Sequence, residues 1–342
     1  MNRAPQRAGA VTMNAETSNI GEFELIRRFF AQRRPAQTAQ SGVILGIGDD
    51  AALLALPPES ELVAAVDTLV AGRHFPAHTD ARSIGHRALA VNLSDIAAMG
   101  ATPAWATLAL TLPNVNVGWL ERFSAGFFEL ADANAVALVG GDTTRGPLTV
   151  SVQILGHVPR GTALRRGGAR AGDLLAVTGT LGDAGAGLKF ATTPSEETTR
   201  SAALQLIQRF DYPAPRVQFG LAARGIATAA MDLSDGLVGD LPKLADASGI
   251  AVHVAVERLP LSAAMRAAVP PAKARDWALA AGDDYELLLA VPPLRYADLD
   301  AAADRLNLTL TVIGEFLPGR GVTWSLNGET FTPGAPGWDH FA

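Results

Sequence analysis

Several aspartates of this 342-residue chain stand directly after apolar runs, and each lies beside glycine or hydroxyl residues. A carboxylate at the end of an apolar strand is costly to bury unless a positive charge compensates it. Oxygen ligands with glycines nearby favour Mg²⁺, which is a hard cation and usually shares its coordination with a phosphate. These acidic clusters lie at residues 46–50, 63–68, 138–144, 230–236 and 281–286.

The first and third clusters each allow a structural interpretation beside the chemical one. Asp49 and Asp50 suit the corner of a β-turn, but adjacent carboxylates repel each other and favour a neighbouring cation. In the third cluster Gly141 and Asp142 follow an apolar strand, which predicts either a hairpin loop or a loop that binds phosphate and metal. Because five such clusters occur in one chain, we favour the metal and phosphate interpretation for both.

The two acids of the fourth cluster, Asp232 and Asp235, stand three residues apart where a strand passes into a helix. Asp or Ser at such a junction serves as a helix cap, and the same helix N-terminus also receives phosphate groups. Asp95 lies in a helix that is too apolar to be a solvated surface helix, and it shares a face with Asn92. Its carboxylate needs a base or a metal, and since Arg87 lies two turns away we favour a metal.

Other kinds of chemistry are excluded or unsupported. Because the chain has no cysteine, thiolate metal sites, disulfides and a cysteine nucleophile are excluded. The glycine-rich run 178–187 lacks the Gly-Lys-Ser/Thr of a P-loop and the dinucleotide-binding pattern, and it predicts a tight strand-to-helix turn. Serine-hydrolase, zinc-protease and protein-kinase motifs do not occur. His74 is a single histidine in a loop shortly after Asp67, and it has either a structural role or a role in the site.

Composition indicates a folded protein, because 48% of the residues are hydrophobic and 18% are charged. The net charge is -6, and no basic run is long enough to bind a nucleic acid. No apolar run approaches the roughly 20 residues that span a bilayer, so we expect a cytoplasmic protein without a membrane partner. Residues 1–18 predict a disordered tail, and Met13 is an alternative start.

The remaining elements predict a mixed α+β chain in two halves, with helices covering one face of a sheet. We place the N-terminal domain at 19–158 and the C-terminal domain at 159–342, because 159–172 reads as a connection rich in glycine and arginine. We expect helices at 21–30, 83–99, 117–134, 202–210, 217–223, 236–248 and 298–306, and strands at 43–47, 51–56, 61–66, 104–112, 136–139, 148–157, 173–178, 226–231, 285–291 and 309–313.

Taken together and in this order, the motifs resemble those of thiamine-monophosphate kinases. The resemblance runs from about Gly21 to the end of the chain and is carried by long, specific motifs. They lie at residues 21–26, 46–54, 67–70, 90–100, 140–147, 232–237 and 338–341.

The resemblance implies a two-domain fold shared with aminoimidazole ribonucleotide synthetase, in which the N-terminal sheet pairs in a homodimer. It implies direct in-line transfer of the γ-phosphoryl group of ATP to thiamine monophosphate with several Mg²⁺ ions. The implied metal ligands are Asp50, Asp67, Asp95, Asp142, Asp232 and Asp235. The implied ATP contacts are Gly141, Asp142, Arg166 and Ser234, and the implied substrate contacts are His74, Asp283 and Trp338.

No residue is assigned as general base or nucleophile, because the acceptor phosphate is already ionised at neutral pH. An aromatic ring at Trp338 and a carboxylate at Asp283 suit a cationic thiazolium. The chain departs from the family pattern at Ala65 and Val66, where serine or threonine is common, at Asp283, which is often glutamate, and at Trp338, which is often a smaller aromatic residue.

Two alternatives remain at this point. The first is another enzyme of the same superfamily, although the selenophosphate synthetases and the hydrogenase-maturation relatives use a cysteine or selenocysteine that this chain lacks. The second is a degenerate kinase that binds nucleotide and senses thiamine phosphates without turnover. The retained acids oppose the second alternative.

Overall fold

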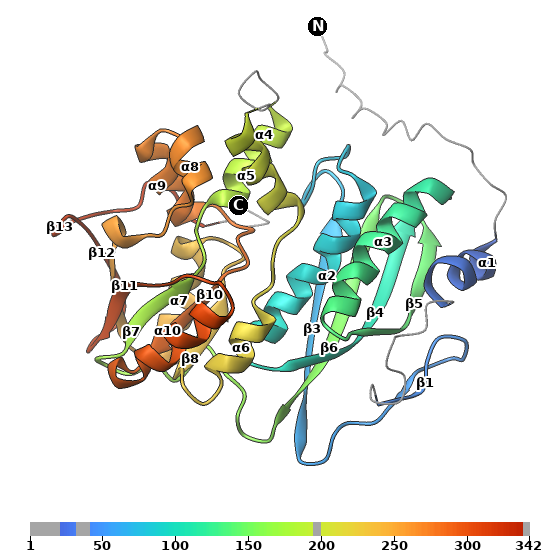
Figure 1. Cartoon of the computed structure of the whole chain (residues 1–342), viewed down its shortest axis with the longest axis horizontal. Helices are drawn as coiled ribbons and strands as arrows, with labels where there is room; N and C mark the ends of the chain where they lie inside the picture. The colour runs from blue at the N-terminus through green and yellow to red at the C-terminus, as the bar shows by residue number, and fades with distance from the viewer. Residues whose placement is uncertain (1–20, 32–41, 194–199, 338–342) are drawn as a thin grey trace, which may run out of the picture.

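The structure, a computed structural model, describes residues 21–31, 42–193 and 200–337. The expected tail at 1–18 and the expected substrate contact Trp338 lie outside these residues. Two sheets, each with its own helices, lie side by side along the longest axis of the molecule (Figure 1). None of the described helices is long and apolar enough to cross a membrane.

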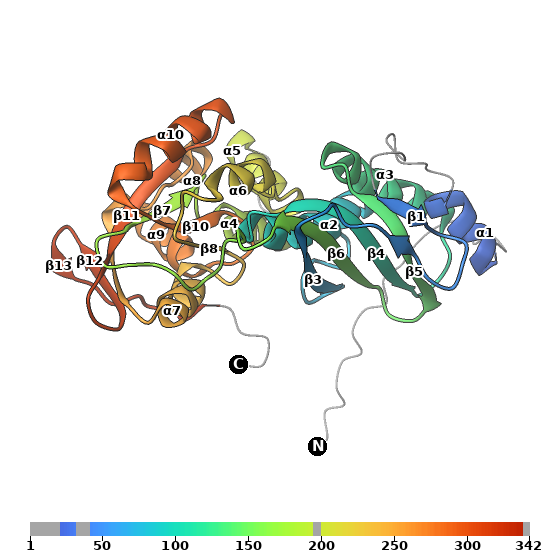
Figure 2. The same cartoon turned by 90° about the horizontal axis from the view of Figure 1, so that it is seen from below.

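The first sheet has four strands in the order β3-β6-β4-β5, and only β4 and β5 run parallel. Helices α2 and α3 pack on one face of this sheet (Figure 2). The strands are β3 (Ser60–Val70), β6 (Thr149–Pro159), β4 (Thr102–Leu112) and β5 (Ala137–Arg145), and the helices are α2 (Ala81–Ala98) and α3 (Val117–Ala133).

Before this sheet, α1 (Glu22–Ile26) continues into η1 (Arg27–Ala31). A small hairpin follows, formed by β1 (Val43–Leu45) and β2 (Leu53–Leu54). The hairpin packs on Trp105 of β4 together with residues of β5, on the face of the sheet that α2 and α3 leave open. On the rest of that face, β3 is the most exposed strand, with Leu62, Ala64, Val66 and Thr68 exposed.

Helix α2 is the central element of the molecule. It begins at the N-cap Asp80, whose side chain accepts a hydrogen bond from the Arg82 N–H, and it ends before Gly100, which has φ +61°. It is buried along nearly its whole length because it packs on the first sheet and α3 on one side and on α6 and β8 of the second half on the other. The expectation of a buried helix here is confirmed.

The second sheet has seven strands in the order β13-β12-β9-β11-β7-β10-β8. They are β7 (Leu174–Thr178), β8 (Ala229–Asp232), β9 (Ala251–Ala255), β10 (Leu287–Val291), β11 (Leu310–Leu317), β12 (Gly321–Leu326) and β13 (Glu329–Thr330). The helices are α4 (Asp183–Thr192), α5 (Ser201–Asp211), α6 (Val217–Ala223), α7 (Leu237–Ser248), α8 (Ala263–Ala268), α9 (Pro271–Ala280) and α10 (Tyr296–Arg305), with single turns η3 (Val256–Arg258) and η4 (Pro293–Arg295).

Successive side chains of β10 point to opposite faces of this sheet, and helices cover both faces. Leu287 and Leu289 join the core that includes residues of α6 and α10, whereas Leu288 and Ala290 join the core formed with α7 and α9. A strand buried on both faces reads as a continuous apolar run rather than an alternating one, and Leu287–Val291 does so. The mixed α+β class is confirmed, but the expectation that helices cover one face of the sheet is wrong for this second sheet, which is covered on both.

The sequence prediction differs from the structure in a few places. The expected turn at Gly140 to Asp142 is wrong, because β5 continues through it to Arg145. Glycine at position 141 lets β5 continue beside β4, because a Cβ there would clash with the carbonyl oxygen of Leu108 at 1.9 Å. The register between β4 and β5 shifts just before this position. The short elements β9, β12, β13, α8 and α9 were not predicted. Helix α9 begins at Pro271. Proline is common both at the first position of a helix and in loops, so it did not indicate a helix here.

Candidate active site

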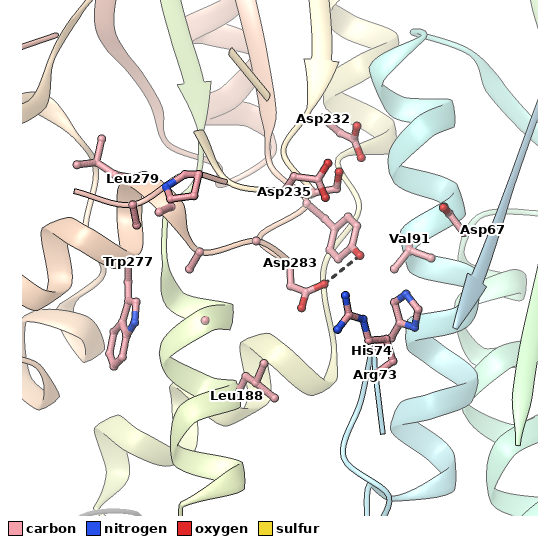
Figure 3. A pocket seen from close by; sticks show the side chains of 18 of the residues that line it. Asp67, Arg73, His74, Val91, Leu188, Asp232, Asp235, Trp277, Leu279 and Asp283 are labelled. Carbon is pink, nitrogen blue, oxygen red and sulfur yellow. Dashed lines mark hydrogen bonds between the residues drawn. The ribbon is translucent and has the colours of Figure 1, made fainter. Parts of the chain in front are cut away.

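A cavity of about 860 Å³ lies where the two halves meet (Figure 3). Its walls are formed by β3 and α2 on one side. On the other side they are formed by the end of β8, the loop before β10, helices α4 and α9, and residues 333–336. Seven residues predicted from the sequence line it together: Asp67, His74, Asp95, Asp232, Ser234, Asp235 and Asp283.

Asp67 enters the cavity from β3, at the edge of the first sheet. Its neighbours across the sheet, Val152 and Leu108, are buried on the face that α2 covers, so the alternation of β3 directs Asp67 to that face. Asn92 of α2 accepts a hydrogen bond from the Asp67 N–H at 3.1 Å, which fixes the backbone here. Burial raises the pKa of the Asp67 carboxyl, and the nearby Asp235 raises it further.

Asp95 of α2 and Asp232 of β8 bring carboxylates together from opposite halves. Burial raises the pKa of Asp95 to about 7, and repulsion from Asp232 and Asp67 adds to the effect. Burial likewise raises the pKa of Asp232 to about 6, although the Ser94 hydroxyl donates a hydrogen bond to its Oδ2 at 2.8 Å and favours the charged form. Because Asp67 raises the pKa of both Asp95 and Asp232, and Asp232 raises that of Asp95, a bound cation would stabilise the cluster.

Asp235 has a lysine as its neighbour. Lys243 Nζ lies 2.7 Å from Asp235 Oδ2 and 2.9 Å from Asp240 Oδ1. Asp240, inside α7, also accepts hydrogen bonds from the backbone N–H groups of Ser234 and Asp235. The turn is therefore held by an acid from the following helix. Neither Asp232 nor Asp235 caps α7, because the N-cap residue of this helix is Gly236, which has no side chain to form a capping hydrogen bond.

The donor chemistry of this cluster fits Mg²⁺, because carboxylates are the hard oxygen ligands that Mg²⁺ selects. In the described residues no three acid or histidine side chains lie close enough together to enclose a metal ion by themselves. That arrangement suits Mg²⁺, which usually keeps several waters and takes only one or two carboxylates beside the phosphates of a substrate.

His74 lies in the loop after β3 and projects into the cavity (Figure 3). The backbone N–H of Val70 donates a hydrogen bond to His74 Nδ1 at 3.0 Å. In the neutral ring the proton is therefore on Nε2, because Nδ1 acts as the acceptor. A ring held in this tautomer can donate a hydrogen bond to an anionic oxygen through Nε2.

Asp283 lies on the wall that the second half contributes. Its carboxylate Oδ1 lies 2.5 Å from Nη2 of Arg87, which comes from α2, and accepts a hydrogen bond from the Tyr285 hydroxyl at 3.2 Å. The sequence indicated Asp283 but assigned no role to Arg87, which was considered only as a distant partner for Asp95. No local pattern could have linked them, since the pair forms only across the two halves.

Three predicted residues lie away from this cavity. Asp50 is exposed at the turn between β1 and β2, and Gly141 and Asp142 lie on β5, the edge opposite β3. Across the sheet, Asp142 is in register with Ala109, Ser151 and Thr68, so it lies on the face opposite to Asp67.

Arg166 lines a second cavity, of about 530 Å³. This second cavity also has Asp95 and Asp232 in its wall, so the two cavities share these acids. Arg166 lies near enough to oppose the raised pKa of both acids. Its side chain is exposed and stays accessible to a ligand.

Several lining residues of the first cavity were not singled out from the sequence. Arg73 stands beside His74, and Leu188 and Trp277 lie on the side of the cavity away from Asp67 (Figure 3). Lys273 also lines the cavity. Lys273 Nζ lies 5.3 Å from the centre of the Trp277 ring. Their signal in the sequence is weak, because lysine and tryptophan on a helix occur equally on ordinary surfaces.

The fold and the acidic cleft between its halves define a class of protein. Residues 48–158 match the family model of the AIR synthase related protein, N-terminal domain. Residues 170–326 match the model of the AIR synthase related protein, C-terminal domain. Both halves of the chain are therefore those of an AIR synthase related protein.

Within this class the similarity is to one kind of enzyme. Thiamine-monophosphate kinase of Salmonella typhimurium is 46% identical over 323 residues, which cover 94% of this chain and 98% of the relative. The crystal structure of thiamine-monophosphate kinase from Stenotrophomonas maltophilia K279a has a TM-score of 0.82 at 46% identity, covering 90% of this chain and 96% of that chain. A structure of AaThiL complexed with AMPPCP and TMP has a TM-score of 0.74 at 34% identity, covering 86% and 92%. The chain belongs to the thiamine-monophosphate kinase family.

Proposed function

We propose that this protein transfers the γ-phosphoryl group of ATP to thiamine monophosphate and forms thiamine diphosphate and ADP. The observation that carries this proposal is the wall of Asp95 and Asp232 shared by two cavities. A donor in one cavity and an acceptor in the other would bring their phosphates to the same acids. The related AaThiL, solved with AMPPCP and TMP, supports this pairing of ligands.

The acids of the shared wall are proposed to hold Mg²⁺. Asp67, Asp95, Asp232 and Asp235 line the cavity and present oxygen ligands. When bound, Mg²⁺ neutralises charge on the phosphoryl oxygens and aligns donor with acceptor. In a single chain Asp50 and Asp142 lie away from this wall, so their role as ligands stays a prediction.

For the nucleotide, we propose that Arg166 and Ser234 contact phosphates at the acidic wall. Arg166 lines the second cavity and Ser234 the first, on either side of Asp232. A guanidinium matches phosphate oxygens through paired hydrogen bonds, which favours Arg166 as the stronger contact. The predicted nucleotide contacts of Gly141 and Asp142 remain proposals. They would require either a second chain or a movement of β5 to bring these residues to the nucleotide.

For thiamine monophosphate, His74 and Asp283 suit the two charged ends of the molecule. The Nε2–H of His74 would donate to the phosphate, and the Asp283 carboxylate would face the cationic thiazolium. Trp338 stays a predicted stacking partner for the ring. No side chain is needed as general base, because the attacking phosphate oxygen is already ionised.

We also propose that two copies pair through the open face of the first sheet. Leu62 and Val66 on this face are 52% and 63% exposed, and Ala64 between them is exposed as well. A row of apolar side chains on an uncovered sheet face favours burial against another surface. A second copy offers the same row by symmetry, as in the homodimer that the resemblance implies. The cytoplasmic location expected from the sequence also remains a proposal.

The test of the function is an incubation of purified protein with ATP, Mg²⁺ and thiamine monophosphate, with products separated by chromatography. We expect thiamine diphosphate and ADP in equal amounts, and no product in the presence of EDTA until Mg²⁺ is restored in excess. ADP without thiamine diphosphate would indicate a different acceptor. Bound ATP without any turnover would instead support the sensor alternative.

A further inference from the structure

Arg87 occupies an unusual position for an arginine, because it is only 2% exposed and lies in the apolar helix α2. Its Nη1 donates a hydrogen bond to the carbonyl oxygen of Phe210 at 2.5 Å, and its Nη2 pairs with Asp283 Oδ1. The guanidinium lies 4.3 Å from the centre of the Phe210 ring and 5.9 Å from that of Tyr285. All of these partners belong to the second half.

Stability alone does not explain a buried arginine at this place. Removing a guanidinium from water costs several kcal/mol, and a well-packed apolar side chain of similar volume is often as stable or more stable. Within the described residues, the Nε of Arg87 has no hydrogen-bond partner, which adds to the cost. Among the partners of Arg87 given above, Asp283 is the one with a charge, and it lines the first cavity.

Asp283 needs to be held in place, because its backbone is strained. Asp283 has φ +71° and Tyr285 has φ +50°, values that non-glycine residues seldom adopt. The loop is docked on the acid-bearing turn through two hydrogen bonds, from the Asp283 N–H to the Ser234 carbonyl and from the Tyr285 N–H to the Leu233 carbonyl, both 2.9 Å. Strain of this kind persists where the surroundings over-determine the conformation, and it is concentrated at functional sites.

The contacts of the carboxylate are divided between its two oxygens. Arg87 and Tyr285 both reach Oδ1, and in the part of the chain that is described no partner reaches Oδ2. The Asp283 side chain is 30% exposed and lines the first cavity, so it remains accessible to a ligand there. One oxygen is fixed by the protein and the other is left for the substrate.

We propose that Arg87 is a positioning residue for the acceptor: it fixes the Asp283 carboxylate, through Oδ1, in the orientation in which Oδ2 meets the cationic ring of thiamine monophosphate. The proposal rests on the proposed function. Because Arg87 belongs to α2 and Asp283 to the second half, the ion pair also sets the acceptor relative to Asp95, which lies two turns along the same helix. Arg87 thus links acceptor binding to the acidic wall.

The test compares Arg87→Met, Arg87→Lys and Asp283→Asn by steady-state kinetics, varying thiamine monophosphate and ATP separately. We expect Arg87→Met to raise the KM for thiamine monophosphate by about tenfold or more and to change the KM for ATP by less than about twofold. Arg87→Lys retains the charge but not the planar contact, so an intermediate KM is expected. Arg87→Met combined with Asp283→Asn should raise KM little more than Asp283→Asn alone, since both act through one contact.

Arg224→Met is the matched control. Arg224 also joins the halves, through a hydrogen bond from its Nη1 to the Gly100 carbonyl at 3.0 Å, but it does not line either cavity. All variants are assayed at a temperature at which circular dichroism shows them folded, and Arg87→Lys serves if Arg87→Met does not fold.

The outcomes separate this proposal from the proposed function. An unchanged KM for thiamine monophosphate in a folded Arg87 variant, or an equal rise in both KM values, would overturn the positioning role while the kinase activity stands. A rise of the same size in Arg224→Met would assign the effect to the contact between the halves and would also overturn it. A wild type that makes no thiamine diphosphate would refute both proposals together.

Discussion

Asp95 and Asp232 show what the site requires at the scale of single residues. Each is an ordinary acid whose pKa rises because burial and neighbouring carboxylates both disfavour its charged form. The Ser94 hydroxyl and the more distant Arg166 offset this effect only partly, because the pKa values remain high. A cation that replaces the protons would relieve the same repulsion, so protons and Mg²⁺ are expected to compete for these side chains.

This competition predicts that Mg²⁺ binding strengthens as pH rises. Below the pKa values of about 6 and about 7 the acids of the metal-free protein are protonated, and above them they are free to bind a metal. We expect the affinity for Mg²⁺ alone, measured by calorimetric titration, to rise about tenfold or more from about pH 6 to about pH 8.

The matched variant for this measurement is Asp95→Asn, which removes the group with the higher pKa. It should bind Mg²⁺ more weakly and keep only the shallow pH dependence, of about twofold, that Asp232 contributes over the same range. An affinity of the wild type that stays constant between the two pH values would contradict the assignment of Asp95 as a metal ligand.

At the scale of elements, α2 positions most of the site. It contributes Asp95 itself, Asn92 to the Asp67 backbone, Ser94 to Asp232 and Arg87 to Asp283. Its own position depends on close packing against α3, where two glycines meet the opposite helix. A Cβ on Gly85 would lie 2.0 Å from the Phe123 carbonyl oxygen, and one on Gly126 would lie 1.9 Å from the Arg82 carbonyl oxygen.

We therefore predict that Gly126→Ala forces α2 and α3 apart and lowers the free energy of unfolding by about 1–3 kcal/mol or more. The matched control is Gly118→Ala in the same helix, where the new Cβ would meet no atom closer than 3.7 Å. The control should be neutral or up to roughly 1 kcal/mol more stable, since alanine favours a helix over glycine. Denaturant unfolding of both variants measures the difference, and equal stabilities would refute the packing argument.

At the scale of the whole molecule, the first sheet separates residues that the motifs suggest should act together. Asp67 and Asp142 lie on strands at opposite edges, three strand spacings or roughly 14 Å apart, and on opposite faces of the sheet. Thr68, which lines the first cavity, lies on the same open face as Asp142. A second copy packed on that face could therefore carry its Asp142 toward this edge of the cavity.

A mixing experiment tests this arrangement. Asp142→Asn and Asp232→Asn are each expected to be inactive, because a neutral amide is a weak ligand for Mg²⁺. If each site uses Asp232 of one chain and Asp142 of the other, chains mixed by co-expression should regain about a quarter of the wild-type rate, since half of the dimers have one intact site.

Sedimentation of the same mixture shows whether dimers are present. Dimers without regained activity would mean that Asp142 acts within its own chain, and monomers would refute the pairing of the sheets. Full activity of folded Asp142→Asn would remove this residue from the metal site altogether.

The sequence by itself determined which acids to examine, because the signal is local. Asp67 and Asp232 follow apolar runs and Asp95 interrupts an apolar helix, and a charge at such positions is costly without compensation. The same local reasoning found the buried helix α2 and the mixed α+β class. It failed at Gly141, where the glycines of a continuing strand resemble those of a turn, because only the neighbouring β4 reveals why glycine is needed there.

Only the tertiary structure decided which residues act on one another. Arg87 lies beside Asp283 because separate segments pack together, and this contact leaves no pattern in the neighbouring sequence. The same packing brings Asp67, Asp95 and Asp232 to one wall and leaves Asp142 on the opposite face of the sheet. The burial that raises the pKa values of the acids in that wall exists only after the two halves have met.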